Sequence, residues 1–154
     1  MVMTSMTAEA SFRLETHSLR TLLDEGHRRA RRERRPVVVS MVRRLPSGDP
    51  LEFFERSAAV TPDRLFWACP SEGYAMAGVG TAWQLAVNGT RRFTDAAIAW
   101  RDCCAQTLLD GDAEVVGTGP VLMGGFAFDP LRPSTPTWDG YPDGLLILPR
   151  YLLT

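Results

Sequence analysis

The chain has 154 residues, a formal net charge of −1, 45% hydrophobic residues and 23% charged residues. These values predict one soluble globular domain, and the nearly neutral charge provides no overall attraction to nucleic acid or to an anionic membrane. No apolar run approaches the roughly 18 residues that a membrane span needs. The start, MVMTSMTAEASFRLE, lacks the basic and apolar regions of a signal peptide, so we expect a cytoplasmic protein.

All 17 basic residues are arginine, so the chain contains no lysine. It therefore cannot supply a lysine general base, a Schiff-base lysine or a phosphate-loop lysine. Cys69, Cys103 and Cys104 are odd in number, which argues against a disulfide framework. His17 and His27 lack the neighbouring ligands of a zinc site. We predict packing or surface roles for all of these cysteines and histidines.

Residues 14–33 carry apolar side chains at three- and four-residue spacing, which predicts a helix. Its end, RRARRERR (Arg28–Arg35), holds six arginines. One interpretation is a surface for nucleic acid or another acidic partner. The other is a solvated helix end, where cations suit the helix dipole and Glu25 can pair with a neighbouring arginine. We favour the second, because no aromatic residues interleave with the arginines.

Pro36 ends this helix, and the β-branched run Val37–Val42 predicts a strand. Asp49 is a good N-cap for a short helix that begins at Pro50, and Glu52 completes a capping-box pattern. We expect three residues to form the buried side of that helix: Leu51, Phe54 and Ala58.

The segment RLFWACP (Arg64–Pro70) predicts a strand, and Gly73–Phe93 predicts a longer one that turns at Asn88–Gly89, a dipeptide favoured in two-residue hairpins. Thr94 is the expected cap of a second helix, Asp95–Leu109, which ends at the following Asp-Gly pair. We expect one face of this helix to carry four packed residues: Ala97, Trp100, Cys104 and Leu108.

The segment GPVLMGGFAFDP (Gly119–Pro130) predicts a buried strand with a bend or bulge at Gly124–Gly125. A proline- and glycine-rich exposed connection, residues 131–144, follows. The last segment, LLILPRYLLT (Leu145–Thr154), is apolar up to its final residue. Either it leaves a bare strand edge, or more chain belongs after it, and we favour the second.

Four segments in this order resemble the N-terminal half of isochorismate synthases, members of the chorismate-utilising enzymes that include anthranilate synthase component I and salicylate synthase. They are RLFWACPSEGYAMAGVGTA, NGTRRF, GPVLMGGFAFDP and WDGYPDGLLILPR. The resemblance runs from about Pro50 to the end of the chain. RLFW and GGFAFDP favour the isochorismate branch over the anthranilate branch. Ala68 departs from the pattern, because many relatives carry an acidic residue there.

The resemblance implies an α+β fold, with largely antiparallel sheet flanked by helices, of which this chain would be an incomplete half of the layered structure. Residues 1–48 would form an N-terminal helix, the arginine-rich segment and the first strand. Residues 49–154 would form the N-terminal part of a chorismate-binding domain, truncated at its C-terminus. Gly124 and Gly125 would let backbone from a neighbouring layer come close, while Phe126 and Phe128 would fill space on one face.

The resemblance also implies a reaction, the isomerisation of chorismate to isochorismate for menaquinone or siderophore synthesis. In that family a lysine is the general base, a glutamate is the general acid, and carboxylates hold magnesium. These groups would lie in the C-terminal half, so we assign no catalytic, cofactor-binding or metal-binding residue to this chain and expect it to be inactive alone. Four carboxylates near predicted loops do not align with the magnesium ligands: Glu72, Asp129, Asp139 and Asp143.

Two alternatives remain open. The chain could be a fragment of another chorismate-utilising enzyme, such as a salicylate synthase. It could also be a non-catalytic module that binds a partner through Arg28–Arg35. The expected partners are chorismate in the complete enzyme and a C-terminal half that is either continuous with this chain or a separate polypeptide. We expect neither a membrane nor nucleic acid as a partner.

Overall fold

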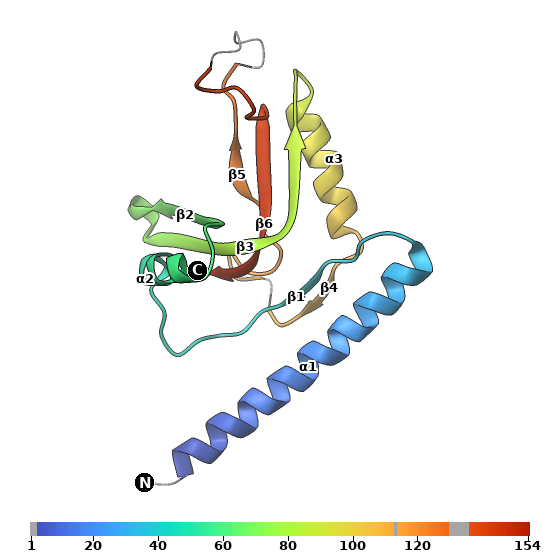
Figure 1. Ribbon diagram of the computed structural model, residues 1–154. Helices are drawn as coiled ribbons and strands as arrows, with labels where there is room; N and C mark the ends of the chain where they lie inside the picture. The colour runs from blue at the N-terminus through green and yellow to red at the C-terminus, as the bar shows by residue number, and fades with distance from the viewer. Residues whose placement is uncertain (1–2, 113, 130–135) are drawn as a thin grey trace.

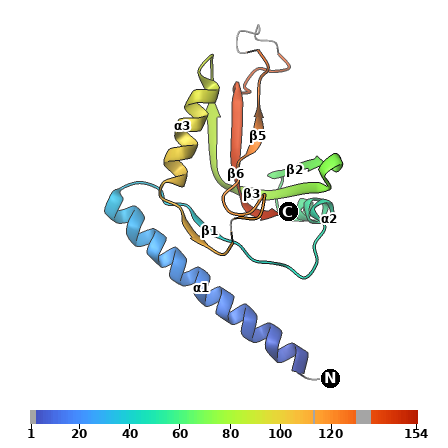
Figure 2. The ribbon, with the colours of Figure 1, turned by 180° about the vertical axis from the view of Figure 1, so that it is seen from behind.

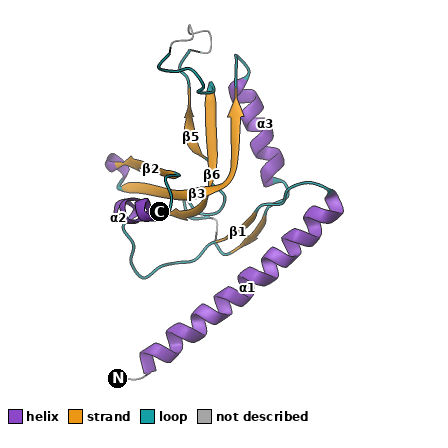
Figure 3. Ribbon diagram, in the orientation of Figure 1, coloured by secondary structure: helices purple, strands orange, loops and turns teal. Residues whose placement is uncertain are grey.

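The computed structural model describes residues 3–112, 114–129 and 136–154, with side chains from residue 17 onward. The helices, shown in Figure 3, are α1 (Met3–Glu33), α2 (Pro50–Arg56) and α3 (Arg92–Cys104). The strands are β1 (Val39–Met41), β2 (Arg64–Cys69), β3 (Tyr74–Val87), β4 (Leu108–Asp110), β5 (Met123–Phe126) and β6 (Gly144–Leu153). Two short 3₁₀ turns, Ser57–Ala59 and Pro70–Glu72, flank β2.

The main sheet has four strands in the order β2-β3-β6-β5, and every neighbouring pair is antiparallel. A second, two-stranded ladder joins β1 to β4 in parallel, and α1 lies against it (Figure 1). The structure therefore confirms the predicted mixture of largely antiparallel sheet and flanking helices. Within the described residues no helix combines the length and apolar character needed to cross a bilayer.

The main sheet is sharply bent, because β3 first crosses the molecule and then turns upward (Figure 1). The register explains the bend: Thr81 pairs with Pro149 but Trp83 pairs with Leu148, so Ala82 is an extra residue in β3. Such a bulge kinks its strand and increases the local twist. Helix α2 lies under the first part of β3 and α3 lies beside the second, so both helices lie outside the bend (Figures 1 and 2).

Helix α2 begins where the sequence predicts. The Asp49 side chain accepts hydrogen bonds from the backbone amides of Leu51 at 2.8 Å and Glu52 at 3.4 Å. The capping box is not completed, because the Glu52 carboxylate pairs instead with Arg56 at 3.1 Å. The predicted buried side is wrong in part: Leu51 is exposed, and so is Ala58, which falls in the following 3₁₀ turn.

Phe54 does face the sheet as predicted. Its ring lies 5.8 Å from the ring of Phe66 on β2, measured between centroids. The Arg64 guanidinium lies over the same ring at 4.7 Å and donates to the Phe54 carbonyl at 2.9 Å. These contacts attach α2 to the edge strand β2.

The predicted hairpin at Asn88–Gly89 is wrong. A turn does occur there, with Gly89 at φ 76°, but the chain passes from β3 into α3 rather than into a second strand. The Gly89 amide donates to the Asp143 side chain at 2.6 Å, and the Asp143 amide donates to the Asn88 side chain at 3.1 Å. The turn is therefore fixed by a residue far along the chain, which local propensity cannot reveal.

The predicted bounds of the second helix are also wrong. Helix α3 starts at Arg92, before Thr94, and ends at Cys104. Leu108 belongs to β4, where it pairs with Val39 of β1. Leu108 continues the apolar spacing of the helix. Its conformation is determined instead by pairing with β1, a parallel strand that is distant in sequence. The packed face is shifted as well, since Ala96 is buried and Ala97 is exposed.

Strand β5 is shorter and less buried than the predicted strand over residues 119–130. Only Met123 of its residues is buried, and β5 is an edge strand. Phe126 contacts Phe93 of α3, with 4.6 Å between ring centroids, whereas Phe128 is fully exposed. The prediction that both phenylalanines fill space on one face is therefore wrong for Phe128. Pro130 and residues 131–135 of the predicted connection lie outside the described residues.

Gly124 does permit a close backbone approach, although within the sheet rather than between layers. It has φ 154°, and a Cβ at this position would lie 2.0 Å from the carbonyl oxygen of Leu145 on β6. A Cβ at Gly125 would meet nothing within 4 Å. Only the first glycine of the pair is therefore required by the packing.

Strand β6 lies between β3 and β5, but β5 pairs only with Gly144–Ile147. The alternative of a bare edge is therefore wrong for the start of Leu145–Thr154, whereas residues 148–153 pair with β3 on one side only among the described strands. Leu152 and Leu153 are half-buried and pair with Gly78 and Ala77. The buried apolar residues of the described chain gather around β3 and β6: Ala77, Val79, Val87, Ala96, Met123 and Leu148. No large side chain among the described residues is fully buried.

Candidate functional site

The acidic residues near loops do not form a metal site. Within the described parts of the chain, no three His, Cys, Asp or Glu side chains gather closely enough to hold an ion. Asp143 is engaged in the turn between β3 and α3, and Glu72 lies in the 3₁₀ turn after β2. Asp139 lies in the exposed connection between β5 and β6. These side chains do not fit a magnesium site, which prefers several carboxylate and water oxygens around one point.

A cavity of about 810 Å³ lies on the outside of the bend. The segment before α2, residues 36–45, forms one wall, and the loop 117–120 forms another. Trp83 and Leu148, the register pair next to the bulge, also line it. The segments that meet here are distant in sequence, so sequence reasoning did not identify the cavity.

Three arginines line this cavity: Arg43, Arg44 and Arg150. The Arg43 guanidinium pairs with the carboxylate of Asp110 at 2.5 Å, which connects the segment after β1 to the end of β4. The Val42 amide also donates to the Asp110 carbonyl at 2.8 Å. All three arginines are exposed residues, and Arg43 has a structural partner in Asp110.

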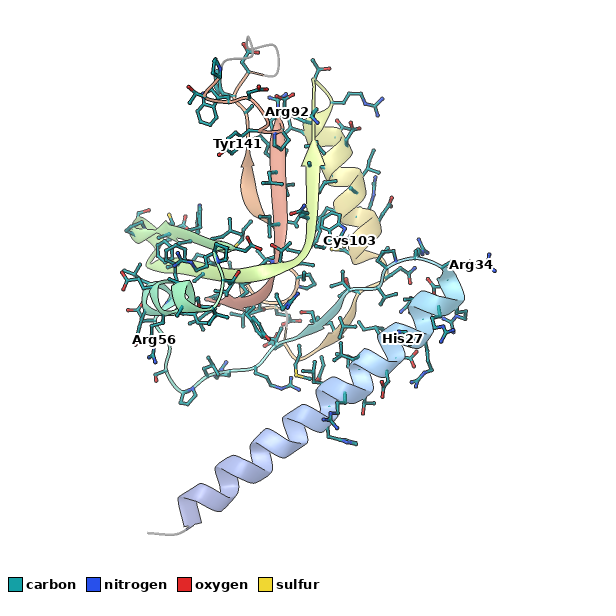
Figure 4. The ribbon with its side chains drawn as sticks, viewed as in Figure 1. His27, Arg34, Arg56, Arg92, Cys103 and Tyr141 are labelled. Atoms are coloured by element: carbon teal, nitrogen blue, oxygen red, sulfur yellow. The ribbon has the colours of Figure 1, made fainter. Side chains whose placement is uncertain are left out.

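Cys103 is the cysteine that lines the cavity, at the end of α3 (Figure 4). Burial raises the pKa of its thiol, and the neighbouring Cys104 raises it further. A raised pKa keeps the thiol protonated, so Cys103 is not set up as a nucleophile. Cys69, Cys103 and Cys104 are all free thiols, in agreement with the prediction of no disulfide framework.

Among the charged side chains that the structure describes, that of Arg92, at the start of α3, is the most buried (Figure 4). It is 5% exposed and donates to the carbonyls of Gly89 at 3.4 Å, Ala127 at 3.1 Å and Phe128 at 3.3 Å. Its guanidinium also lies 4.4 Å from the ring centroid of Phe93. These contacts tie the start of α3 to the segment after β5. Arg92 therefore has a structural role. The motif NGTRRF did not predict that its side chain would be buried and bonded to backbone carbonyls.

The Arg28–Arg35 run forms the end of α1, where internal ion pairs hold most of its arginines. Arg28 pairs with Glu25 at 2.7 Å. Glu33 accepts from three others at 3.2–3.4 Å: Arg29, Arg32 and Arg35. This arrangement favours the interpretation of a solvated helix end over a nucleic-acid surface. His27 lies on this part of α1 and is exposed, and Arg34 directly follows the helix (Figure 4).

Comparison with known proteins gives two relatives. The chain is 28% identical over 155 residues to isochorismate synthase MenF of Bacillus subtilis (strain 168), covering 96% of this chain and 31% of that protein. It is 30% identical over 132 residues to the salicylate biosynthesis isochorismate synthase of Pseudomonas aeruginosa, covering 86% of this chain and 26% of that protein. The chain thus spans about a third or less of the length of these relatives. No solved structure was found to match it.

Residues 25–154 match the family described as chorismate binding enzyme. The match covers the end of α1, the whole main sheet and both other helices. It includes all four segments on which the resemblance to isochorismate synthases was based. The chain therefore belongs to the chorismate-binding enzyme family.

Proposed function

We propose that this chain is part of an isochorismate synthase, which isomerises chorismate to isochorismate for menaquinone or siderophore synthesis. The proposal is based on the two relatives that match this chain. Both are isochorismate synthases, and each matches nearly all of this chain with about a third or less of its own length. This part would be the N-terminal one, as the order of the four segments suggests.

The chain alone is expected to be inactive. The reaction that the resemblance implies uses a lysine base, and this sequence has none. It also uses carboxylate-held magnesium, and the described acidic side chains do not gather around one point. Both functions would fall to the remainder of the enzyme. The role of this chain is then to supply sheet and helices that support the remainder.

The direct test is an assay of the purified 154-residue chain with chorismate and magnesium. We expect no isochorismate above the background without protein. The complementary measurement uses a chimera, in which this chain replaces the matching stretch of the Bacillus subtilis MenF. We expect the chimera to form isochorismate, whereas an inactive chimera would contradict the proposal. Formation of salicylate instead would favour a different member of the chorismate-utilising enzymes.

A further inference from the structure

Strand β2 is an edge of the main sheet that carries no feature to prevent pairing with another strand. It pairs with β3 on one side and with no other described strand. Sheet edges in soluble proteins usually carry a lysine, an inward charge, a proline or a bulge, which discourage pairing between molecules. From Leu65 to Cys69 the strand has none of these, and its register with β3 is regular. The three residues in its middle are exposed: Phe66, Trp67 and Ala68.

The other strand edges of the described chain are poorer templates for pairing. β5, at the opposite edge of the same sheet, has four residues and contains Gly124 and Gly125. The part of β6 beyond β5 contains Pro149, which has no amide hydrogen to donate. β1 and β4 have three residues each. An added strand would therefore find its longest regular template at β2.

The hydrogen bonds between β2 and β3 determine which backbone groups of β2 point outward. The Gly80 amide donates to the Asp63 carbonyl at 2.8 Å, and these two residues extend the β2–β3 register by one pair. In an antiparallel ladder, residue pairs that exchange hydrogen bonds alternate with pairs that do not. Every second residue counted from Asp63 therefore bonds to β3. The amides and carbonyls of the residues between them point away from the sheet: Arg64, Phe66 and Ala68.

These outward groups are complementary to a second copy of the same strand. A two-fold axis at Phe66 places this residue opposite its own copy, and places Arg64 opposite Ala68 of the second copy. All of the outward amides and carbonyls then pair, which gives about six hydrogen bonds. The same register places Pro62 opposite Pro70, so the residues without an amide hydrogen lie just beyond both ends of the paired stretch. A shift of the register in either direction brings one of these prolines into the ladder.

The side chains near this edge suit a contact with protein. Val60, which precedes β2, is 82% exposed, Phe66 is 39% exposed and Trp67 is 46% exposed. In the self-paired register, Leu65 lies opposite Trp67 of the second copy, on the face away from α2. The two Phe66 rings lie on the other face, where each already contacts Phe54 of its own chain. Cross-strand pairs of aromatic and aliphatic side chains stabilise antiparallel sheets.

We infer that the chain forms a two-fold symmetric dimer, in which β2 pairs antiparallel with β2 of a second copy and joins the two main sheets into one. A strand from an unrelated protein could use the same backbone groups. The positions of Pro62 and Pro70 at the two ends of the self-paired ladder favour a second copy. The inference does not depend on the proposed function. Because the paired stretch is short, we expect a weak dimer that dissociates on dilution.

Sedimentation equilibrium over a range of concentrations measures the dimer, and charge variants at Ala68 test the register. Ala68 lies opposite Arg64 of the second copy, and the two-fold axis makes this contact occur twice. Ala68→Arg therefore opposes like charges, whereas Ala68→Glu opposes a cation with a carboxylate. We expect the dissociation constant to be about tenfold or more higher for Ala68→Arg than for Ala68→Glu, with a smaller difference at high salt. The same pair of substitutions at Ala97, which is exposed on α3, should leave the constant unchanged.

A disulfide locates the symmetry axis. Phe66→Cys places two thiols at directly opposite positions, where Cα atoms lie about 5.5 Å apart and a disulfide can form. Oxidation should give a dimer linked through residue 66, identified by peptide mass spectrometry. Native Cys69 is the internal control, because in this register it lies roughly 20 Å from Cys69 of the second copy and should not link to it.

Several outcomes would overturn the inference. A chain that stays monomeric at every concentration has no such dimer, and assemblies that grow beyond the dimer would indicate open-ended association. Equal dissociation constants for the two Ala68 variants, or a dimer without the link at residue 66, would place the contact on another surface. If Ala68→Arg does not fold, the unsubstituted chain, Ala68→Glu and the disulfide still decide. None of these results changes the expected activity of the MenF chimera, so the proposed function is tested separately.

Discussion

Arg92 is a buried cation whose partners are backbone carbonyls. Its planar guanidinium reaches three carbonyl oxygens that belong to two segments, before α3 and after β5. A lysine ammonium is a single point charge and cannot reproduce that fork. Arg92 therefore joins the two segments in a way that a conservative substitution would not preserve.

We predict that Arg92→Met destabilises the chain by about 2 kcal/mol, because buried carbonyls lose their donors. Arg92→Lys should recover only part of this loss. The measurement is urea denaturation followed by tryptophan fluorescence. Arg91→Met is the control, since Arg91 is exposed and pairs with Asp95 at 3.3 Å, and we expect a change within about 0.5 kcal/mol. Equal effects of the two substitutions would contradict the role given to Arg92.

Arg34 has an unfavourable backbone conformation. It follows the last residue of α1 with φ 53°, and among the described non-glycine residues it alone has a positive φ. The next amide, that of Arg35, donates to the Ala30 carbonyl at 3.3 Å, which closes the helix end. Glycine is the usual residue at such a helix end, because it adopts this conformation without steric strain.

We predict that Arg34→Gly stabilises the chain, by up to about 1 kcal/mol, because it relieves left-handed strain. The matched control is Arg31→Gly, which puts the same change inside α1 and should destabilise by about 1 kcal/mol. Thermal unfolding of both variants provides the comparison. A loss of stability in Arg34→Gly would show that the side chain contributes more than the strain removes.

At the scale of elements, the paired glycines of β5 have different roles. Gly124→Ala would bring a methyl group into the Leu145 carbonyl, and the φ of 154° is also poorly suited to alanine. We expect a loss on the order of 2 kcal/mol or more and faster amide exchange in β5 and the adjoining part of β6. Gly125→Ala, with nothing within 4 Å, should change stability by less than about 0.5 kcal/mol. Similar losses in both variants would contradict this assignment.

We expect acid to destabilise the end of α1, because it protonates the carboxylate of Glu33. Burial alone would raise the pKa of Glu33, but hydrogen bonds from Arg29 and Arg32 outweigh it, and the pKa lies below its ordinary value of 4.5. A lowered pKa means that the folded state favours the carboxylate, so its contribution is present above about pH 4.5 and is lost as the pH falls through the folded pKa.

We therefore predict that α1 loses helix content as the pH falls below about 4.5, with a smaller change in Glu33→Gln, which has no carboxylate to protonate. Far-ultraviolet circular dichroism across this range is the measurement. High salt should weaken the effect, because the ion pairs are at least partly solvated. Identical acid profiles for the two proteins would show that Glu33 does not control the helix end.

The sequence predicts the elements whose signals are local. Asp49 defines the start of α2 through its cap, and β2 ends one residue before the predicted Pro70. The errors occur where distant partners decide. Asn88–Gly89 is a dipeptide typical of hairpin turns, but a hydrogen bond to Asp143 fixes this turn instead. Leu108 continues the apolar spacing of the helix, but it pairs with β1. The cavity depends on several segments, so no single motif could have revealed it.

At the scale of the whole molecule, the large exposed surface has a thermodynamic consequence. Because the chain exposes 11359 Å², it buries less surface on folding than a compact protein of its size. The denaturant m-value scales with the surface exposed on unfolding. We predict an m-value about a fifth lower than that of typical domains of this length. An m-value in the usual range would mean that in solution the chain buries more surface, by itself or in a second copy.

The bulge at Ala82 sets which side chains meet which neighbours for the rest of β3. Removing this one residue would restore an even pairing with β6 and turn every later side chain of β3 over. Trp83, which lines the cavity, would then point away from it, and Gln84 would take its place. A single codon thus decides whether the second part of β3 offers α3 a tryptophan, a leucine and a valine, or a glutamine and an alanine.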